Sequence, residues 1–445
     1  MASPGPLLLV GGEPVGPRMA GPAIRSLELA RAVAAAGIEV TLAVPAASGG
    51  VEMPPGVRRI ALDNAGLGAA VGSHACALVG AGILSRFPRL ASADIPLAVD
   101  LYDPVPLEAA ELYREAPRAV ASAALAQASA NLRLELTRAD MILCAGRRQH
   151  DLWTGALMTM GRLTPGMYAA DPTLEGMVRV VPFGVPPGRP RAGGLRGRVP
   201  GIGAADTIAI WGGGIHQWFD APTAIRATGL LTAGNPGLRL VFMGSTPPNL
   251  ALAPHGAVSA ARAVAAELGL LDGQVVFLDG WMDYADRGAA LADANIGVSA
   301  HHRTAETRFA WRTRLLDYLW AGLPVACTEG DELGDRIAAA GAGLTTPAGD
   351  AEALAHSMRT LAEAGPRREA AIAAARTLAG ELSWDRVAAP LVEWARTPVR
   401  LGGRGNRVLA TAALWRMFAT KGWQTARTEG PSAAIGRYRR FRDRD

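Results

Sequence analysis

The sequence has little lysine, little cysteine and no long apolar run. Lys421 is the only lysine beside 44 arginines in 445 residues, a bias typical of a GC-rich bacterium rather than of nucleic-acid binding. Cys76, Cys144 and Cys327 lie far apart without a CxxC pair, which excludes a cysteine zinc site and a disulfide framework. No stretch approaches the roughly 18 apolar residues of a membrane-spanning helix, and the N-terminus lacks the basic start of a signal peptide. We therefore expect a cytoplasmic protein.

Charge is unevenly spread along the chain. The formal net charge is +5, but the residues from Arg400 onward carry +8, so the remainder carries −3. Apolar residues make up 49% and charged residues 19%, a globular composition. The body is mildly acidic and the tail is the basic element, so we expect no nucleic acid as a partner.

Strand-like and helix-like segments alternate in the first half of the chain. The apolar run Leu7–Val10 ends in two glycines, and apolar spacing from Pro22 to Ala36 predicts a helix that Gly37 ends. Further strands are expected at Glu39–Val44, Arg59–Leu62, Pro96–Leu101, Met141–Ala145 and Val178–Phe183. This order indicates an α/β fold in which helices cover both faces of a parallel sheet.

The same alternation starts again after a stretch rich in proline, glycine and arginine, which predicts a linker at 184–203. The strands expected beyond it are Thr207–Trp211, Leu238–Met243, Val275–Leu278, Ile296–Ser299 and Leu323–Cys327, and a helix Trp384–Trp394 follows. We therefore expect α/β domains at 1–183 and 204–383, a helical segment at 384–397 and a basic tail at 398–445.

Two loops at the carboxyl ends of expected strands are candidate ligand sites, because open parallel sheets bind ligands there. Gly11–Gly21 leads into a helix N-terminus, which favours anions, but it lacks the GxGxxG spacing of dinucleotide sites. Asp100 and Asp103, in DLYDP, follow another strand. They either orient ligand hydroxyls or form a turn before Pro104.

The segment Glu306–Gly322 (ETRFAWRTRLLDYLWAG) combines an apolar helix face with charge. Glu306 is placed in the loop before the helix, 11 residues or about three helical turns from Asp317. Backbone amides there would form an anion site. A carboxylate beside an anion site is costly unless it binds hydroxyl groups. A ligand with a phosphate and a polyol part would therefore satisfy both the anion site and Glu306. The alternative is that these charged residues simply form the solvent-exposed start of a helix. Fixed positive charge comes from Arg308, Arg312 and Arg314.

The run RTRLLDYLWAGLPVACTEGD (Arg312–Asp331) resembles the donor motif of family-4 glycosyltransferases of the GT-B fold. The resemblance extends to the loop GGEPVGPRMAGPAIR, to DLYDP, to WGGGIHQWFDAPTAIRA and to DGWMDYADR, but not to the tail after Arg400. It implies two Rossmann-like domains facing across a cleft, with the last helix crossing back to the first domain. A nucleotide-sugar donor would bind the C-terminal domain and a small-molecule, glycan or lipid-linked acceptor the N-terminal one. Transfer would retain anomeric configuration and need neither metal nor a separate cofactor.

The resemblance also assigns residues on the donor side. Asp317 matches the second acidic residue of the paired motif, which holds the ribose; the position of the first is Phe309, so Glu306 is taken as the ligand of the sugar hydroxyls. Many relatives place Arg and Lys after the first strand of the C-terminal domain to neutralise the diphosphate, whereas this chain reads GGGIHQWFD. That charge is therefore assigned to His216, Arg312 and Arg314, with the amides of Gly212, Gly213 and Gly214.

Further residues complete the expected cleft. The resemblance implies that Trp281 and Met282 lie against the nucleobase, with packing in the core as the alternative, and His301 and His302 are expected to line the donor site. Gly12, Arg18, Asp100 and Asp103 belong to the acceptor side. No HxxxH spacing supports a metal, and the only Asp-x-Asp lies in the terminal tail.

Two alternatives to a retaining transferase stay open. Because the Arg/Lys pair is missing, the chain could be a non-catalytic GT-B homologue that binds a nucleotide-sugar or a partner enzyme. It could also be a GT-B enzyme that couples a cyclitol donor.

The tail has two interpretations. Val408–Trp423 mixes Leu414, Trp415 and Phe418 with basic residues, and Arg437–Arg444 is densely basic. It either forms an amphipathic helix in peripheral contact with an anionic membrane, presenting a lipid-linked acceptor, or packs onto the protein with a solvated basic end.

Overall fold

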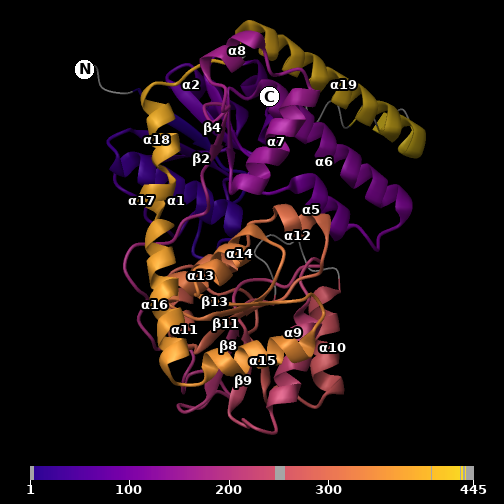
Figure 1. The fold of residues 1–445 in the computed structure, drawn as a ribbon. Helices are drawn as coiled ribbons and strands as arrows, with labels where there is room; N and C mark the ends of the chain where they lie inside the picture. The colour runs from indigo at the N-terminus through magenta and orange to yellow at the C-terminus, as the bar shows by residue number, and fades with distance from the viewer. Residues whose placement is uncertain (1–4, 246–255, 402, 431, 434–435, 437–445) are drawn as a thin grey trace.

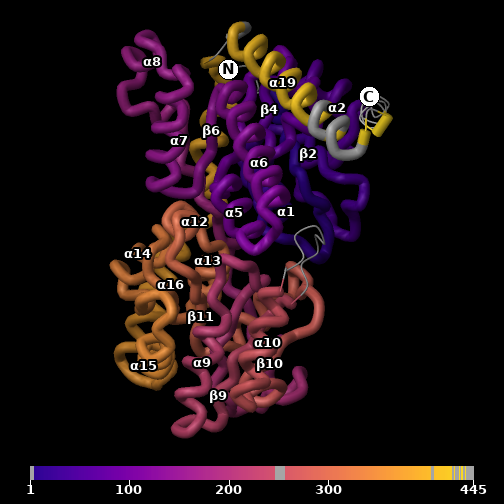
Figure 2. The backbone as a smooth tube through the Cα atoms, turned by 90° about the vertical axis from the view of Figure 1, so that its right-hand side faces the viewer, coloured from indigo at the N-terminus to yellow at the C-terminus, as the bar shows by residue number. Residues whose placement is uncertain are grey.

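The chain folds into two lobes, each built on one parallel sheet (Figure 1). The structure is a computed structural model that describes residues 5–245, 256–401, 403–430, 432–433 and 436. Both lobes are Rossmann-like, as expected from the alternation of strands and helices. A quarter-turn view shows them stacked, with the N-terminal lobe above the C-terminal one (Figure 2).

The N-terminal sheet has seven strands in the order β3-β2-β1-β4-β5-β6-β7, all parallel. Its chain order starts in the middle at β1 and moves outward in both directions, so the carboxyl ends of β1 and β4 lie at the switch point. The strands are β1 (Leu7–Val10), β2 (Val40–Val44), β3 (Val57–Ala61), β4 (Cys76–Gly80), β5 (Leu97–Asp100), β6 (Met141–Cys144) and β7 (Val178–Val180).

The second sheet has six parallel strands in the order β10-β9-β8-β11-β12-β13. Most strands of both sheets are fully buried apolar runs, as parallel sheets covered on both faces require. The strands are β8 (Thr207–Trp211), β9 (Leu238–Phe242), β10 (Val275–Phe277), β11 (Ile296–Ser299), β12 (Val325–Thr328) and β13 (Gly343–Thr346).

Helices cover both sheets. In the N-terminal lobe they are α1 (Gly21–Ala35), α2 (Asn64–Val71), α3 (Ile83–Arg86), α4 (Pro88–Ser92), α5 (Val105–Leu112), α6 (Arg118–Arg138), α7 (Arg147–Thr159) and α8 (Pro165–Ala170). In the C-terminal lobe they are α9 (Ala221–Leu231), α10 (Ala257–Glu267), α11 (Arg287–Asp293), α12 (Ala305–Phe309), α13 (Thr313–Ala321), α14 (Glu332–Ala339), α15 (Ala351–Ala362) and α16 (Pro366–Glu381).

The chain returns to the first lobe after α16. The short helices α17 (Trp384–Val387) and α18 (Ala389–Arg396) continue along one side of the molecule and pack against α1 (Figure 1). The proline- and glycine-rich stretch before β8 contains no helix or strand, and it is held to α11 by Asp293, whose carboxylate accepts from the amides of Gly193 and Leu195 at 3.0 and 2.7 Å.

The sequence analysis did not predict the strands β4 and β13, and it predicted one helix where the structure has two. β4 and β13 contain alanine, glycine and threonine among few large apolar residues, so their patterns are weak. The segment Glu306–Gly322 contributes to two helices, α12 and α13, rather than to one. Glu306 therefore precedes α13 as expected, but it lies in the first turn of α12 and not in a loop.

The tail forms α19 (Gly403–Glu429), which packs on α6 and α4 of the N-terminal lobe. The basic run Arg437–Arg444, the terminal Asp443 and Asp445, and the side chain of Trp423 lie outside the described residues. No helix in the described part of the chain is long and apolar enough to cross a membrane.

Candidate active site

Gly214, His216, Trp281 and Arg314, which the sequence analysis expected on the donor side, lie together just after the carboxyl end of β8. The glycine turn after β8 is the centre of this arrangement. The amide of Gly212 donates to the hydroxyl of Tyr318 at 2.8 Å, and that hydroxyl donates to the carbonyl of Val298 on β11 at 2.8 Å. Gly213 has a φ of +71°, and a Cβ at this position would meet none of the described residues within 4 Å, so its backbone is open to a ligand.

Gly214 brings two of the expected side chains together. A Cβ at this position would lie 3.2 Å from Nε2 of His216 and 3.2 Å from the ring of Trp281. The ring of His216 stacks on Trp218 at 4.8 Å. Burial, together with the nearby positive charges of the site arginines, lowers the pKa of His216 to about 4, so its imidazole is neutral at pH 7.

Arg314 is the cation that lies nearest to this turn. Its Nη2 donates to the carbonyl of Gly214 at 2.6 Å, and its guanidinium lies 3.7 Å from the ring centroid of Phe219 and 4.5 Å from that of Trp211. Burial lowers the pKa of Arg314 to about 9. Its Nη1 has no hydrogen-bond partner within the described residues. A buried guanidinium with an unused donor is suited to an anionic ligand.

Arg312 has a different partner from the one expected. Its Nη1 and Nη2 donate to Oε1 and Oε2 of Glu306 at 2.9 and 2.6 Å, with both side chains at most 4% exposed. The guanidinium also lies 5.0 Å from the ring of Phe219. The two residues thus form a bidentate buried ion pair, and most of the charge of Arg312 is neutralised by Glu306.

Asp317 lies on the exposed side of α13. Its Oδ1 is 3.3 Å from Nε of Arg287, and its side chain is 31% exposed. Arg287 stacks over the ring of Tyr284 at 3.7 Å, and the hydroxyl of Tyr284 donates to Glu28 of the first lobe at 3.2 Å. The carboxylate of Asp317 retains an accessible edge for a hydroxyl ligand.

The DGWMDY loop touches the N-terminal lobe directly. Nε1 of Trp281 donates to the carbonyl of Met19 at 3.1 Å, and the amide of Tyr284 donates to the carbonyl of Pro17 at 2.7 Å. Met282 packs partly buried against the large core cluster. Arg18 of the opposing loop is exposed and lies 4.0 Å from Asp283. Trp281 therefore joins the lobes beside the glycine turn.

The two histidines that follow β11, His301 and His302, lie in different environments. His301 is 1% exposed, with Nε2 4.0 Å from Oδ2 of Asp331, and burial lowers its pKa to about 3. Asp331 caps α14, and burial raises its pKa to about 6. His302 is half exposed, 4.0 Å from Asp220. In the described part of the chain, no group of three or more His, Cys, Asp or Glu side chains has metal-site geometry.

On the acceptor side, Asp100 is bound by Arg25. Nε and Nη2 of Arg25 donate to its two carboxylate oxygens at 2.6 and 2.9 Å, and Arg25 is 1% exposed. Asp100 therefore fixes α1 to the sheet. A Cβ at Gly12 would lie 3.5 Å from the side chain of Ile83 and 3.8 Å from that of Arg86.

Asp103 lies close enough to Glu306 of the C-terminal lobe for the two carboxyl groups to interact. Burial raises the pKa of Asp103 to about 7, and the negative charges of Asp100 and Glu306 act in the same direction. Glu108, which the sequence analysis missed, has its pKa raised by burial and by Asp103 and Glu306. A bridge from Gln149 ties the two lobes together here, because its Nε2 donates at 2.7 Å to the carbonyls of both Tyr102 and Phe309.

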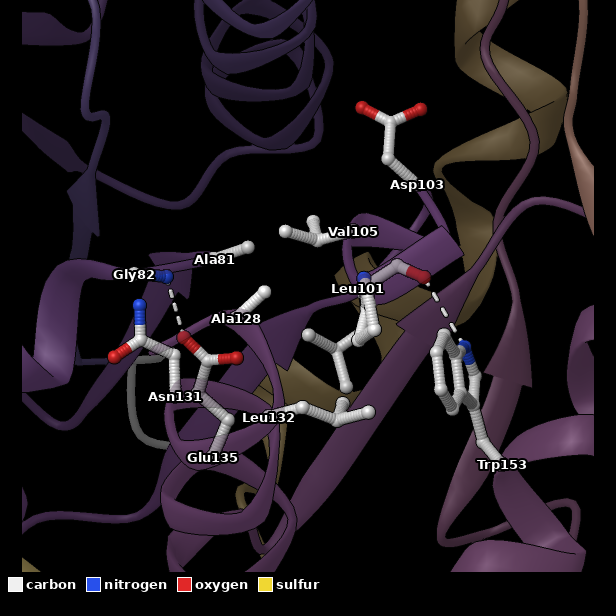
Figure 3. Close-up of a pocket in the computed structure, with 11 residues that line it drawn as sticks. Ala81, Gly82, Leu101, Asp103, Val105, Ala128, Asn131, Leu132, Glu135 and Trp153 are labelled. Atoms are coloured by element: carbon white, nitrogen blue, oxygen red, sulfur yellow. Dashed lines mark hydrogen bonds between the residues drawn. The ribbon is translucent and has the colours of Figure 1, made fainter. Parts of the chain in front are cut away.

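A cavity of about 110 Å³ opens between β4, β5 and α6 beside Asp103 (Figure 3). Its polar wall is formed by Asn131 and Glu135 of α6, and the Gly82 amide donates to Glu135. Burial raises the pKa of Glu135 to about 8. The apolar wall includes Leu101, Val105, Ala128, Leu132 and Trp153. A cavity with one polar and one apolar wall suits a hydroxylated ring.

The ionisation of Asp103 makes stability depend on pH. A carboxyl with a raised pKa binds its proton more tightly in the folded state, so stability is lost as pH rises from about 4 towards about 7. We therefore expect Asp103→Asn to gain stability relative to the parent protein as pH rises. Thermal unfolding at pH 5 and pH 8 measures this, with the exposed Asp279→Asn as control. If the stability difference between Asp103→Asn and the parent protein is the same at pH 5 and at pH 8, the prediction is wrong.

Comparisons with known proteins identify the fold. No protein-family model matches the chain, and no curated protein does. Among solved structures, sucrose-phosphate synthase from Thermosynechococcus elongatus is 16% identical, with a TM-score of 0.57 over 95% of this chain and 100% of that one. HepE from Anabaena in complex with UDP-glucose is 15% identical, with a TM-score of 0.62 over 87% and 98%. WaaG, a glycosyltransferase involved in lipopolysaccharide biosynthesis, is 16% identical, with a TM-score of 0.59 over 88% and 100%.

These matches cover 87–95% of this chain and therefore include both of its lobes. The chain therefore has the GT-B fold, in which two Rossmann-like domains face each other, as the sequence resemblance implied. At identities of 15–16% the similarity is one of fold.

Proposed function

We propose that the protein is a glycosyltransferase that moves a sugar from a nucleotide-sugar to an acceptor hydroxyl, with retention of configuration and without a metal. The observation that carries the proposal is the open glycine turn after β8 beside Arg314, whose Nη1 has no partner among the described residues. The fold similarity to a protein solved with UDP-glucose supports the same class of donor.

Each donor-side group has a distinct task in this proposal. The backbone at Gly213 and the guanidinium of Arg314 bind the diphosphate, whose negative charge grows as the glycosidic bond breaks. The exposed carboxylate edge of Asp317 accepts from the ribose hydroxyls. His216 is neutral, so it orients a phosphate by one hydrogen bond and does not add charge.

The Glu306–Arg312 pair has a positioning role. The charge of Glu306 acts on Asp103, and Arg312 holds the Glu306 carboxylate in one orientation. Since the acceptor hydroxyl must attack on the face from which the diphosphate leaves, the departing phosphate oxygen takes its proton. No protein nucleophile is needed in this scheme.

The acceptor is assigned to the cavity beside Asp103. Glu135 is protonated at neutral pH because its pKa is about 8, so it can donate a hydrogen bond to an acceptor oxygen. Trp153 and Leu101 would pack against the apolar face of a sugar or related ring. An acceptor bound in this cavity would extend its reacting hydroxyl past Asp103 towards Glu306.

Hydrolysis of a panel of nucleotide-sugars, followed by nucleotide release, tests the function. We expect Asp317→Asn to lower turnover by about 10- to 100-fold, since a charge-assisted hydrogen bond contributes roughly 1.5–3 kcal/mol. Asp279→Asn is the matched control, because its side chain is 99% exposed. Unchanged turnover in Asp317→Asn would contradict the donor site, and saturable binding without any turnover would indicate the non-catalytic homologue.

A further inference from the structure

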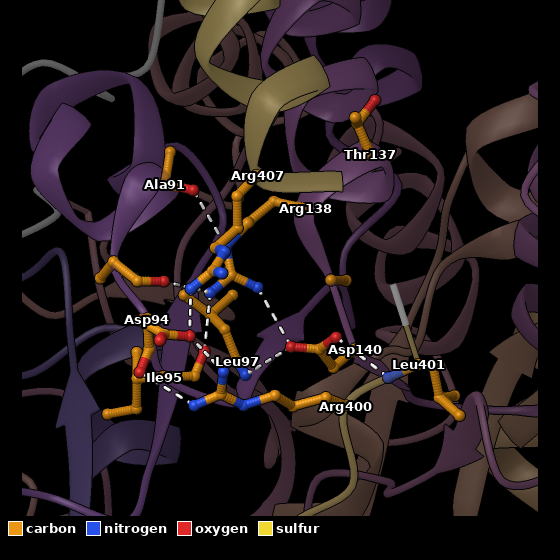
Figure 4. A network of polar contacts seen from close by, with 12 residues as sticks. Ala91, Asp94, Ile95, Leu97, Thr137, Arg138, Asp140, Arg400, Leu401 and Arg407 are labelled. Carbon is orange, nitrogen blue, oxygen red and sulfur yellow. Dashed lines mark hydrogen bonds and ion pairs between the residues drawn. The ribbon is translucent and has the colours of Figure 1, made fainter. Parts of the chain in front are cut away.

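The tail helix α19 is fixed on the N-terminal lobe in one orientation. Asp94 accepts from Arg400 and Arg407, and Asp140 accepts from the amide of Leu401 at 3.1 Å (Figure 4). Arg138 holds Asp140 in place through a 3.1 Å ion pair. The start of α19 is therefore tied to the end of α4 and to the start of β6 by two carboxylates.

One face of α19 is used for this packing. Ala410 and Leu414 are 0% and 4% exposed and belong to the core cluster that includes α4 and α6. Met417 and Phe418 pack partly buried against the same cluster. These positions recur at helical spacing, so the inner face of α19 is occupied by the protein.

The opposite face is also apolar, but nothing in the described structure covers it. Val408, Leu409 and Trp415 are 61%, 59% and 63% exposed. Ala412 and Ala419 lie on the same side at spacings of four and eleven residues from Val408 and are exposed. We name this set, with the adjacent Arg416, the outer face of α19. A tryptophan and two branched aliphatic residues exposed together are typical of a docking surface.

The charge of the helix indicates what docks there. The sequence of α19 contains five basic residues, and its last residue, Glu429, is the only acidic one. Arg416 and Lys421 are exposed in the described part of α19. A basic helix with exposed tryptophan and leucine matches the interface of an anionic bilayer, where apolar side chains enter the acyl boundary and cations pair with headgroups.

We propose that the outer face of α19 docks the protein on an anionic lipid surface. The helix lies on the lobe that carries the Asp103 cavity, so docking would bring that lobe to the membrane. A second copy of this chain is the competing occupant, but repulsion between equally basic helices opposes self-association. The proposal does not depend on the transferase activity, because docking is measured without it.

Vesicle flotation of the full chain tests the proposal. The probes are vesicles of phosphatidylcholine alone and vesicles with about 30% phosphatidylglycerol. We expect binding to the anionic vesicles that falls at high salt, because exposed charges are screened. Val408→Ser/Leu409→Ser/Trp415→Ser should lower the apparent vesicle affinity by about tenfold or more, and Arg416→Gln/Lys421→Gln should lower it on anionic vesicles only.

The matched control removes exposed apolar side chains elsewhere. Met158, Leu230 and Leu268 are 58%, 56% and 40% exposed on other helices or helix ends, so their triple serine variant should float like the parent protein. Circular dichroism confirms that both triple variants are folded. The proposal fails if the parent protein does not float with anionic vesicles, or if both triple variants bind equally. It also fails if light scattering shows a dimer that only the outer-face variant dissociates.

Discussion

Replacing Arg312 with methionine is expected to destabilise the protein by about 3–5 kcal/mol and to abolish transfer. Arg312 makes two short hydrogen bonds to Glu306, and both side chains are buried. Removing the arginine leaves a buried carboxylate without its counter-charge, which is costlier than losing the pair as a whole. Chemical denaturation and nucleotide release from the donor measure the two effects.

A second variant separates folding from function at this site. In Glu306→Leu/Arg312→Met, apolar side chains replace both charges, so we expect most of the stability to return. Turnover should stay at least about 100-fold below that of the parent protein, because the proposed site has lost the oriented carboxylate of Glu306. The exposed Arg308→Met is the control, with parent-like stability. A fully active double variant would show that the pair is only structural.

Asp100→Asn is expected to cost about 3–5 kcal/mol in the free energy of unfolding. Arg25 donates to both oxygens of Asp100 and also to the carbonyls of Val181 and Pro182 at 2.9 and 3.0 Å. An amide in place of the carboxylate leaves a buried guanidinium without its counter-charge, which is costly.

The control for Asp100→Asn lies three residues along the chain. Asp103→Asn keeps the strand end, breaks no hydrogen-bonded arginine pair and removes a carboxyl whose pKa is raised, so it should show no such loss of stability at pH 7. Equal losses in the two variants, measured by denaturant unfolding at pH 7, would contradict the assignment of Asp100 to the fold and of Asp103 to the site.

Long apolar segments made the fold predictable from the sequence. Leu7–Val10 and Met141–Cys144 are strands that the sequence predicted almost residue for residue, because fully buried parallel strands are continuous apolar runs. Cys76–Gly80 and Gly343–Thr346 were missed because small residues weaken the signal, and their place is set by neighbouring strands.

The site was only partly accessible from sequence. The glycine turn and Arg314 follow recognisable segments, but the pairing of Arg25 with Asp100 joins residues 75 positions apart. Glu135 resembles an ordinary charged residue on a long helix, and no local pattern indicates that it is 2% exposed beside Gly82.

Local composition was enough to predict the alternation of strands and helices, the repeated architecture and the basic character of the tail. Hydrophobic periodicity and turn residues can be recognised within a few positions of the sequence. Tertiary packing alone decided which carboxylates are neutralised by arginine and which keep a raised pKa. It also decided which side of α19 is buried. Burial and charge pairing depend on residues brought together from distant segments, and no single stretch of sequence contains that information.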